Sequence, residues 1–194
     1  LQWLKLHDST KEKALLSDKY AVREWVKEKI GEEYLIPLLG VYDSFDEIDF
    51  DKLPNQFVLK ANHGSGRNII VKDKAAFDKR AAKRKFDRWM KMDFSFYFGF
   101  QLHYQYIDRK IVAEKYLENN GELDDYKVMC FGGKAEYIWI DLGRYEEHRR
   151  NIYDVNWKLV DMQMVYPNET KDVPPPVNLH KMIEFAEVMS QGFP

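Results

Sequence analysis

The stretch FVLKANHGSGRNIIVK (residues 57–72) places two glycines between two runs of strand-forming residues. Residues 57–61 and 68–72 are rich in Phe, Val, Leu and Ile, which favours two strands. The polar, glycine-containing residues 62–67 would then form the connecting loop. The stretch therefore predicts a hairpin with a glycine loop at its tip.

The chemistry of this hairpin suits a phosphate chain. Gly64 and Gly66 let backbone N–H groups approach an anion closely, because no Cβ intervenes. Strand alternation puts Lys60 on the face opposite Phe57 and Leu59, so the ammonium group can point at phosphate while its neighbours pack. A Walker A loop and a dinucleotide fingerprint both require a helix after the glycines, whereas a strand follows here. We expect a flap over a triphosphate, and the alternative is an ordinary hairpin with an incidental lysine.

The rest of the chain predicts an α+β fold without internal repeats. Apolar residues at helical spacing predict a first helix over residues 22–30, with Ser17 as its cap and Gly31 as its stop signal. The interrupted apolar pieces of residues 34–42 predict short strands or turns. The aromatic run at residues 94–100 predicts packing under a helix rather than a base-stacking platform. The remaining expected elements are a helix over 74–92, strands over 111–117, 125–131 and 135–141, a short strand pair at 151–154 and 158–160, and a last helix over 179–190.

Composition limits the function classes. The 194 residues are 45% hydrophobic, and the formal net charge is −2, so no global field would recruit nucleic acid or an anionic membrane. No apolar run approaches the roughly 20 residues of a spanning helix, and we expect no membrane insertion. We interpret the single cysteine, Cys130, as a structural thiol. A chain with one cysteine fits a reducing compartment, and we expect a cytoplasmic protein. Because the chain begins with Leu1, we expect a piece of a longer chain.

A second motif is IVAEKYLENNGE (residues 111–122), which reads as a strand that ends in a turn. Glu114 interrupts its apolar run. An acid at such a position usually lies on the solvent face of a strand. It can also mark the edge of a cleft, where carboxylates and carbonyls accept hydrogen bonds from an adenine amino group or a ribose.

Together these motifs carry a resemblance to a known family. The hairpin at 57–72, AEKYL at 113–117, DYKVMCFGGKAEYIWID at 125–141 and RRNIYD at 149–154 resemble the ATP-grasp fold, most closely its teichuronopeptide-biosynthesis (TupA-like) branch. The likeness runs from about residue 19 to the end. It implies that ATP phosphorylates a carboxylate and that an amine attacks the acyl phosphate, in the synthesis of a cell-surface polysaccharide or peptide polymer.

The resemblance also implies a domain organisation and a cofactor. Two α+β subdomains would hold the nucleotide in a cleft between them. Residues 1–56 would form a helical segment that precedes the ATP-grasp subdomains. Residues 57–113 would form the subdomain that carries the flap, and residues 114–194 would form a second, incomplete subdomain. The acids that bind Mg²⁺ are expected beyond the end of this chain. Four acids of the second half are expected at solvated turns, namely Asp124, Asp125, Asp141 and Asp154.

Residue roles follow from the same resemblance. Lys60 matches the lysine on the α and β phosphates. The loop that covers the phosphates matches His63, Gly64, Ser65 and Gly66. For His63, a hydrogen bond that fixes the loop is an equal alternative. The hinge that meets adenine matches Glu114, Lys115, Tyr116 and Leu117. Within this hinge, the Lys115 side chain would contact phosphate.

Two further sets of residues are implied less directly. Glu118 or Glu122 would bind the ribose. The cations that offset the charge of the transferring phosphoryl group match Lys127, Arg149 and Arg150. Because the Mg²⁺ ligands are not identified in this sequence, a non-catalytic module that binds nucleotide or a partner protein is the alternative to a ligase. A scaffold that binds no nucleotide is a third possibility.

Overall fold

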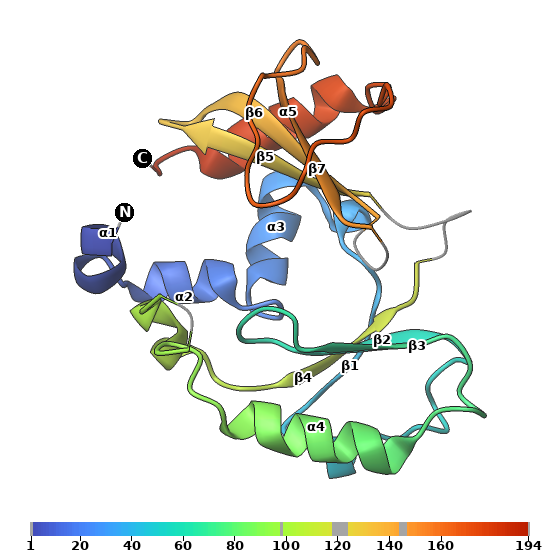
Figure 1. The fold of residues 1–194 in the computed structure, drawn as a ribbon. Coiled ribbons are helices and arrows are strands. Elements are labelled where there is room, and N and C mark those ends of the chain that lie inside the picture. Colours follow the sequence, from blue (N-terminus) through green and yellow to red (C-terminus); the bar gives the residue numbers. More distant parts are fainter. Residues whose placement is uncertain (1, 98, 118–123, 144–146, 194) are drawn as a thin grey trace. The chain divides into compact units, whose positions relative to one another are not determined.

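The computed structural model describes residues 2–97, 99–117, 124–143 and 147–193. The chain divides into two compact units, Leu1–Leu117 and Glu118–Pro194. Each unit contains its own antiparallel sheet (Figure 1).

A four-stranded antiparallel sheet forms the centre of the first unit. The predicted hairpin is confirmed, because the strand that begins at residue 57 pairs with the strand that begins at residue 68. The strand predicted over 111–117 ends two residues earlier, at Lys115. In sheet order, the strands are β1 (Leu38–Tyr42), β4 (Ile111–Lys115), β2 (Phe57–Ala61) and β3 (Asn68–Val71).

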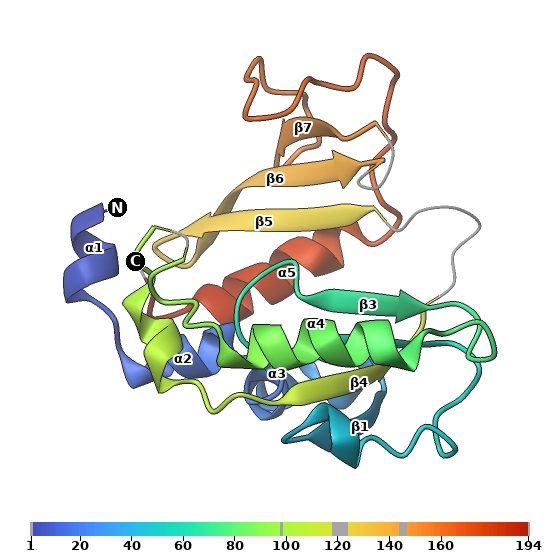
Figure 2. The same ribbon diagram turned by 60° about the horizontal axis from the view of Figure 1, so that its bottom comes forward.

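One face of this sheet carries the core. Phe57 and Leu59 are fully buried in one apolar cluster with Phe86 of α4 (Lys79–Lys91), which runs along the sheet in Figure 2. The helix predicted over residues 74–92 begins later than expected, at Lys79. The side chain of Asp78 accepts a hydrogen bond from the backbone N–H of Ala81 and caps the helix there.

The unit begins with three short helices, α1 (Gln2–His7), α2 (Lys11–Ser17) and α3 (Val22–Ile30). Gly31 ends α3 with φ +111°, which confirms the predicted stop signal. The predicted cap at Ser17 is wrong, because Ser17 is the last residue of α2. Asp18 instead accepts hydrogen bonds from the backbone N–H groups of Tyr20 and Ala21, at the turn before α3. Among the described residues of this unit, three short 3₁₀ helices lie at Glu32–Tyr34, Phe45–Glu47 and Leu102–Tyr106.

The aromatic segment is less buried than its sequence predicts. Phe94 is 4% exposed, so packing is confirmed for this residue. Phe96, Tyr97 and Phe100 are at least half exposed, and for them the prediction is wrong. Phe98 lies outside the described residues.

The second unit has a three-stranded antiparallel sheet and one helix that contacts it. Gly132 and Gly133 both have positive φ at the turn between the first two strands, as a tight hairpin turn requires. The strand predicted over 125–131 and the helix over 179–190 are confirmed. Residues 151–154 belong to a longer strand that pairs with its predecessor, while only an isolated bridge joins Tyr153 to Leu159. The elements are β5 (Asp125–Phe131), β6 (Lys134–Leu142), β7 (Arg149–Asp154) and α5 (Leu179–Ser190).

In the part of the chain that the structure describes, no helix has the length and apolar character needed to cross a membrane.

Candidate functional site

Lys60 and Glu114 lie on the face of the first sheet that is opposite the core. In the register of β2 and β4, Val58 is opposite Glu114 and Lys60 is opposite Val112, which makes Lys60 and Glu114 diagonal neighbours on one face. The Lys60 ammonium group and a Glu114 carboxylate oxygen are 2.5 Å apart. The predicted alternation of β2 is confirmed, because Lys60 is partly exposed while Phe57 on the other face is buried.

Glu114 is buried and holds two cations. It is 5% exposed, so the interpretation as a solvent-facing acid is wrong. Its second oxygen accepts a hydrogen bond from Arg23 of α3 at 3.3 Å. Arg23 also donates to the carbonyl oxygen of Ile36 at 2.6 Å, which fixes its guanidinium group beside the sheet. Such charge-assisted contacts compensate the cost of burying the carboxylate.

A third cation, Lys19, joins this face from the segment between α2 and α3. Its ammonium group donates to the carbonyl oxygen of Gly64 at 2.5 Å and to that of Asn62 at 3.4 Å. Burial lowers the pKa of Lys19, and the positive charge of Lys60 lowers it further. We call Lys19, Arg23 and Lys60, grouped around Glu114, the cation cluster.

Asn62 anchors the glycine loop where it leaves β2. Its side chain is fully buried and donates to Asp18 Oδ1 at 2.9 Å and to the carbonyl oxygen of Asp108 at 2.8 Å. Asn62 Oδ1 accepts from the backbone N–H of Lys110 at 2.8 Å. These bonds fix the position of the loop relative to β4 and the segment before α3.

His63 also holds the loop from inside. It is 3% exposed, and its Nε2 lies 3.2 Å from the carbonyl oxygen of Trp89. Burial lowers the pKa of His63, so the neutral imidazole dominates near pH 7. Of the two roles expected from the sequence, these contacts favour the hydrogen bond that fixes the loop.

The exposed part of the loop is its tip, at Ser65 and Gly66. Gly64 is buried with φ +76°, and a Cβ added there would lie 2.4 Å from the Phe94 ring. Gly66 has φ +70° and open space around it. In the residue after the tip, the Arg67 guanidinium group lies 5.4 Å from the centre of the Tyr97 ring. The first half of the loop, residues 62–64, is therefore buried, and its tip is exposed.

The predicted hinge continues β4 to the end of the first unit. Lys115 is exposed, and its backbone N–H donates to the carbonyl oxygen of Pro37 at 2.9 Å. Tyr116 is half-buried and Leu117 is 39% exposed. The predicted ribose acids, Glu118 and Glu122, lie outside the described residues.

Two of the three predicted catalytic cations converge on Asp141 in the second unit. Asp141 lies on β6 and is 2% exposed. Its carboxylate accepts from Lys127 Nζ at 2.6 Å and from Arg150 Nε and Nη2 at 2.6 and 3.1 Å. Asp141 was expected at a solvated turn, and this is wrong because β6 lies between β5 and β7 in the sheet.

Aromatic rings and a histidine complete this group. His148 Nε2 lies 3.1 Å from Asp141, and its ring stacks on Tyr166 at 3.6 Å between centroids. The Arg150 guanidinium lies 4.9 Å from the Trp139 ring centre, within cation–π range. Burial raises the pKa of Asp141, but the hydrogen bonds from Arg150, Lys127 and His148 outweigh it and hold this pKa well below its ordinary value.

Arg149 does not join this group. Neighbouring residues of a strand point to opposite faces, and Arg149 precedes Arg150 on β7. Its guanidinium group donates to the carbonyl oxygen of Asn168 at 3.2 Å and pairs with Glu147.

The sequence did not indicate several residues of these two groups. Lys19 and Arg23 contact loop and strand residues 43 to 91 positions away, so no local pattern marks them. Asp141 had a usable signal, since it follows the continuous apolar run of residues 137–140, which is consistent with a buried strand. The other residues that were missed are Asp18, Asn62 and His148.

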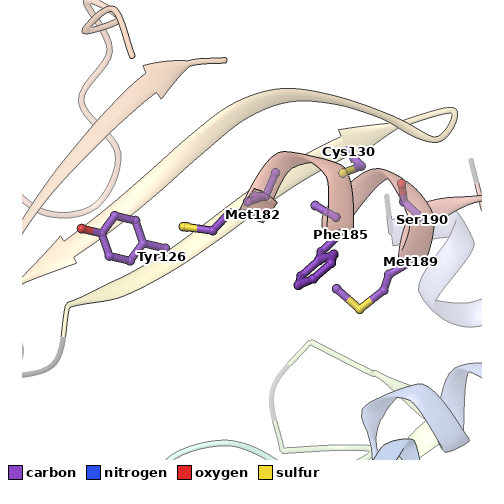
Figure 3. Close-up of a pocket in the computed structure, with 8 residues that line it drawn as sticks. Tyr126, Cys130, Met182, Phe185, Met189 and Ser190 are labelled. Atoms are coloured by element: carbon purple, nitrogen blue, oxygen red, sulfur yellow. The ribbon is translucent and has the colours of Figure 1, made fainter. Parts of the chain in front are cut away.

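An apolar cavity of about 470 Å³ lies in the second unit, against α5 and β5. Figure 3 shows the side chains of Met182, Phe185 and Met189 from α5 beside those of Tyr126 and Cys130 from β5. Cys130 is half-buried among the residues that line this cavity.

Metal binding is predicted from the family resemblance rather than from a visible ligand group. Over residues 2–97, 99–117, 124–143 and 147–193, no three His, Cys, Asp or Glu side chains are grouped in a way that could hold a metal ion.

Antiparallel sheets mixed with helices, and a lysine on the strand before a glycine loop, are compatible with an ATP-grasp protein. The chain matches the TupA-like ATPgrasp family over residues 1–194 and therefore belongs to it. No curated protein and no solved structure gave a significant match. Membership suggests an ATP-dependent, ligase-type role, and ATP-grasp proteins generally bind ATP and Mg²⁺.

Proposed function

We propose that this chain is an ATP-dependent carboxylate–amine ligase domain that binds the nucleotide's phosphates on the cation cluster, under the glycine loop. The observation that carries the proposal is the ion pair of Lys60 and Glu114 on the sheet face beside this loop, in a member of the TupA-like ATPgrasp family. A lysine that already faces a carboxylate has the position and charge to bind a phosphate oxygen.

The charge balance of the cluster supports a polyanionic ligand. Cations outnumber carboxylates, because Lys19, Arg23 and Lys60 surround Glu114, and Asp18 is the other acid close to Lys19. We propose that, when ATP binds, the Lys60 ammonium group leaves the Glu114 carboxylate and pairs with the phosphates of ATP instead. Exposed backbone N–H groups at the loop tip would cover the phosphates from above.

In the proposed reaction, ATP phosphorylates a carboxylate and an amine displaces the phosphate. Lys127 and Arg150 are proposed to offset the charge of the transferring phosphoryl group. Asp141 supports this assignment because it holds both cations with fixed geometry. The contacts of Arg149 favour a structural role in the following loop. We propose a cell-surface polysaccharide or peptide polymer as the product class, and bound Mg²⁺ would neutralise phosphate charge.

Calorimetric titration with ATP and Mg²⁺ tests the binding step. Lys60→Met should weaken ATP binding at least tenfold, whereas Lys72→Met, an exposed lysine at the end of the same hairpin, should leave it unchanged. Equal binding by wild type and Lys60→Met would refute the phosphate site. Release of ADP that depends on both a carboxylate and an amine would support the ligase. Binding without such release would favour the non-catalytic module.

A further inference from the structure

We infer that the outer face of α4 is an electrostatic docking surface for an anionic membrane, whose lipid phosphates bind a row of four cations. Side chains three and four positions apart share one face of a helix, so four cations at that spacing form one row. All four are exposed. We call this row the cationic ridge, and its residues are Arg80, Arg84, Arg88 and Lys91.

The positive charge is concentrated on α4 and is not a property of the whole chain. The 13 residues of the helix contain seven Lys or Arg and one acid, Asp87, which gives a net charge of +6. The whole chain has a net charge of −2, so the other residues together carry −8. Lys83, which lies beside the ridge, pairs with Asp46 at 2.6 Å and with Asp87 at 3.4 Å. Among the described residues, no acid pairs with a side chain of the ridge itself.

The helix gains little stability from this arrangement of charge. Like charges four positions apart repel each other, and Arg84 has such a neighbour on both sides. Arg80 lies in the first turn, where the helix dipole disfavours a cation, and no acid offsets it there. The dipole favours only the two cations of the last turn, Arg88 and Lys91. A helix face that serves only solvation usually alternates the sign of its charges, so the uniform ridge indicates an anionic partner.

The shape and composition of the ridge favour an extended anionic surface. The apolar side of α4 is used by the core, since Phe86 is fully buried and Trp89 is 8% exposed, and it is not free to insert into lipid. No large apolar side chain of α4 is exposed, so none is placed to stack on a nucleic-acid base. At 1.5 Å per residue the row from Arg80 to Arg88 is about 12 Å long, which exceeds a single phosphate group. Among extended anions, the proposed product class, a cell-surface polymer, favours the membrane, and this last step rests on the proposed function.

Docking through the ridge leaves the proposed ATP site free. α4 packs on the face of the first sheet that carries Phe57 and Leu59 (Figure 1). Lys60 and Glu114 lie on the opposite face of that sheet. A membrane at α4 and a nucleotide at Lys60 would therefore bind on opposite sides of the sheet.

Flotation of the 194-residue chain with lipid vesicles tests the inference. The vesicles contain phosphatidylcholine alone or with about 30% phosphatidylglycerol, which supplies the anionic phosphates. Wild type should float only with the anionic vesicles. Salt at about 1 M should release it, because the Debye length then falls to about 3 Å.

Two triple variants with the same change of net charge locate the binding surface. The ridge variant should bind the anionic vesicles roughly a hundredfold more weakly, or about 2.7 kcal/mol, since each cation near such a surface contributes on a similar scale. The control variant removes three exposed lysines from α2 and α3 and should bind as wild type does. The ridge variant is Arg80→Gln, Arg84→Gln and Arg88→Gln, and the control variant is Lys11→Gln, Lys27→Gln and Lys29→Gln.

Three results would overturn the inference. The first is failure of wild type to float with anionic vesicles, and the second is equal flotation of the two variants. The third is binding to RNA or polyglutamate that depends on the ridge but occurs without flotation, because it would assign this face to a soluble polyanion. None of these results affects the ATP site, which the titration with Lys60→Met tests separately.

Urea denaturation separates docking from a structural role of the ridge. Glutamine has a helix propensity close to that of arginine, and the substitutions remove repulsion within the row. The ridge variant should therefore be at least as stable as wild type. A clearly lower midpoint would assign the arginines a structural role and overturn the inference.

Discussion

Glu114→Gln removes the negative charge around which the cation cluster is built. The glutamine keeps the size of the side chain, so the perturbation is electrostatic rather than steric. Glu114 is 5% exposed, and its oxygens lie 2.5 Å from Lys60 and 3.3 Å from Arg23. The substitution leaves two cations on a mostly buried face without their carboxylate partner.

The magnitude follows from the burial of these groups. Removing one partner of a fully buried ion pair costs about 3–5 kcal/mol, because the remaining charge stays buried. Here the side chains of Lys60 and Arg23 are 24% and 15% exposed, so water can partly solvate both cations. We therefore expect Glu114→Gln to lower the free energy of unfolding of the first unit by about 2–3 kcal/mol.

Urea denaturation, followed by far-UV circular dichroism, measures this change. With a slope of about 1–3 kcal/mol/M, the midpoint of the first unit should fall by roughly 0.7–3 M. Glu28→Gln is the matched control, since Glu28 is exposed on α3, and its effect should stay within about 0.5 kcal/mol. Glu114→Gln combined with Lys60→Met should cost less than the sum of the single substitutions, because they share one ion pair.

Two results would refute this reasoning. A stability of Glu114→Gln equal to that of Glu28→Gln would mean that Glu114 does not hold the cations. Strict additivity in the double-mutant cycle would mean that the contact between Lys60 and Glu114 contributes no coupling energy.

Two other substitutions test the loop and the second unit. Gly64→Ala should destabilise the chain by about 2–3 kcal/mol, since a Cβ would meet the Phe94 ring at a positive φ, whereas Gly66→Ala should cost only about 1 kcal/mol. Urea midpoints compare the two, and equal losses would contradict the packing of Gly64. The lowered pKa of Asp141 stabilises the fold above the ordinary carboxyl value of about 3.9, and this contribution is lost as the pH falls toward the folded-state pKa. Asp141→Asn should therefore reduce stability at pH 7 and flatten the acid limb of the stability profile, and an unchanged acid limb would show that another group causes it.

Local patterns predicted those elements whose cause is local. The hairpin of residues 57–72 follows from two apolar runs and a glycine loop, and the turn at Gly132 and Gly133 follows from the need for positive φ. The start of α4 was missed because Asp78 caps it, although helical spacing extends to residue 74. A side chain that binds the backbone can thus override periodicity.

The site was only partly predictable, for a physical reason. Lys60 and Glu114 were identified from their motifs, but their pairing depends on the register of β2 and β4. Arg23 reaches Glu114 across 91 positions, and Asp141 is buried because Lys127 and Arg150 neutralise it from adjacent strands. Arg23 and Glu114 are too far apart for any local sequence pattern, and the partners of Asp141 meet it only through the register of β5, β6 and β7.

The register of one strand pair determines both the core and the cation cluster. β4 lies between β1 and β2, so a carboxylate on it needs cations from the neighbouring strand and from above the sheet, which Lys60 and Arg23 supply. A slip of one residue in β2 would turn Lys60 into the core and Phe57 out of it. The apolar residues that fix the register therefore also fix the direction of the ammonium group. Stability of the first unit and the proposed phosphate binding both depend on that register, so a core substitution that shifts β2 should impair both.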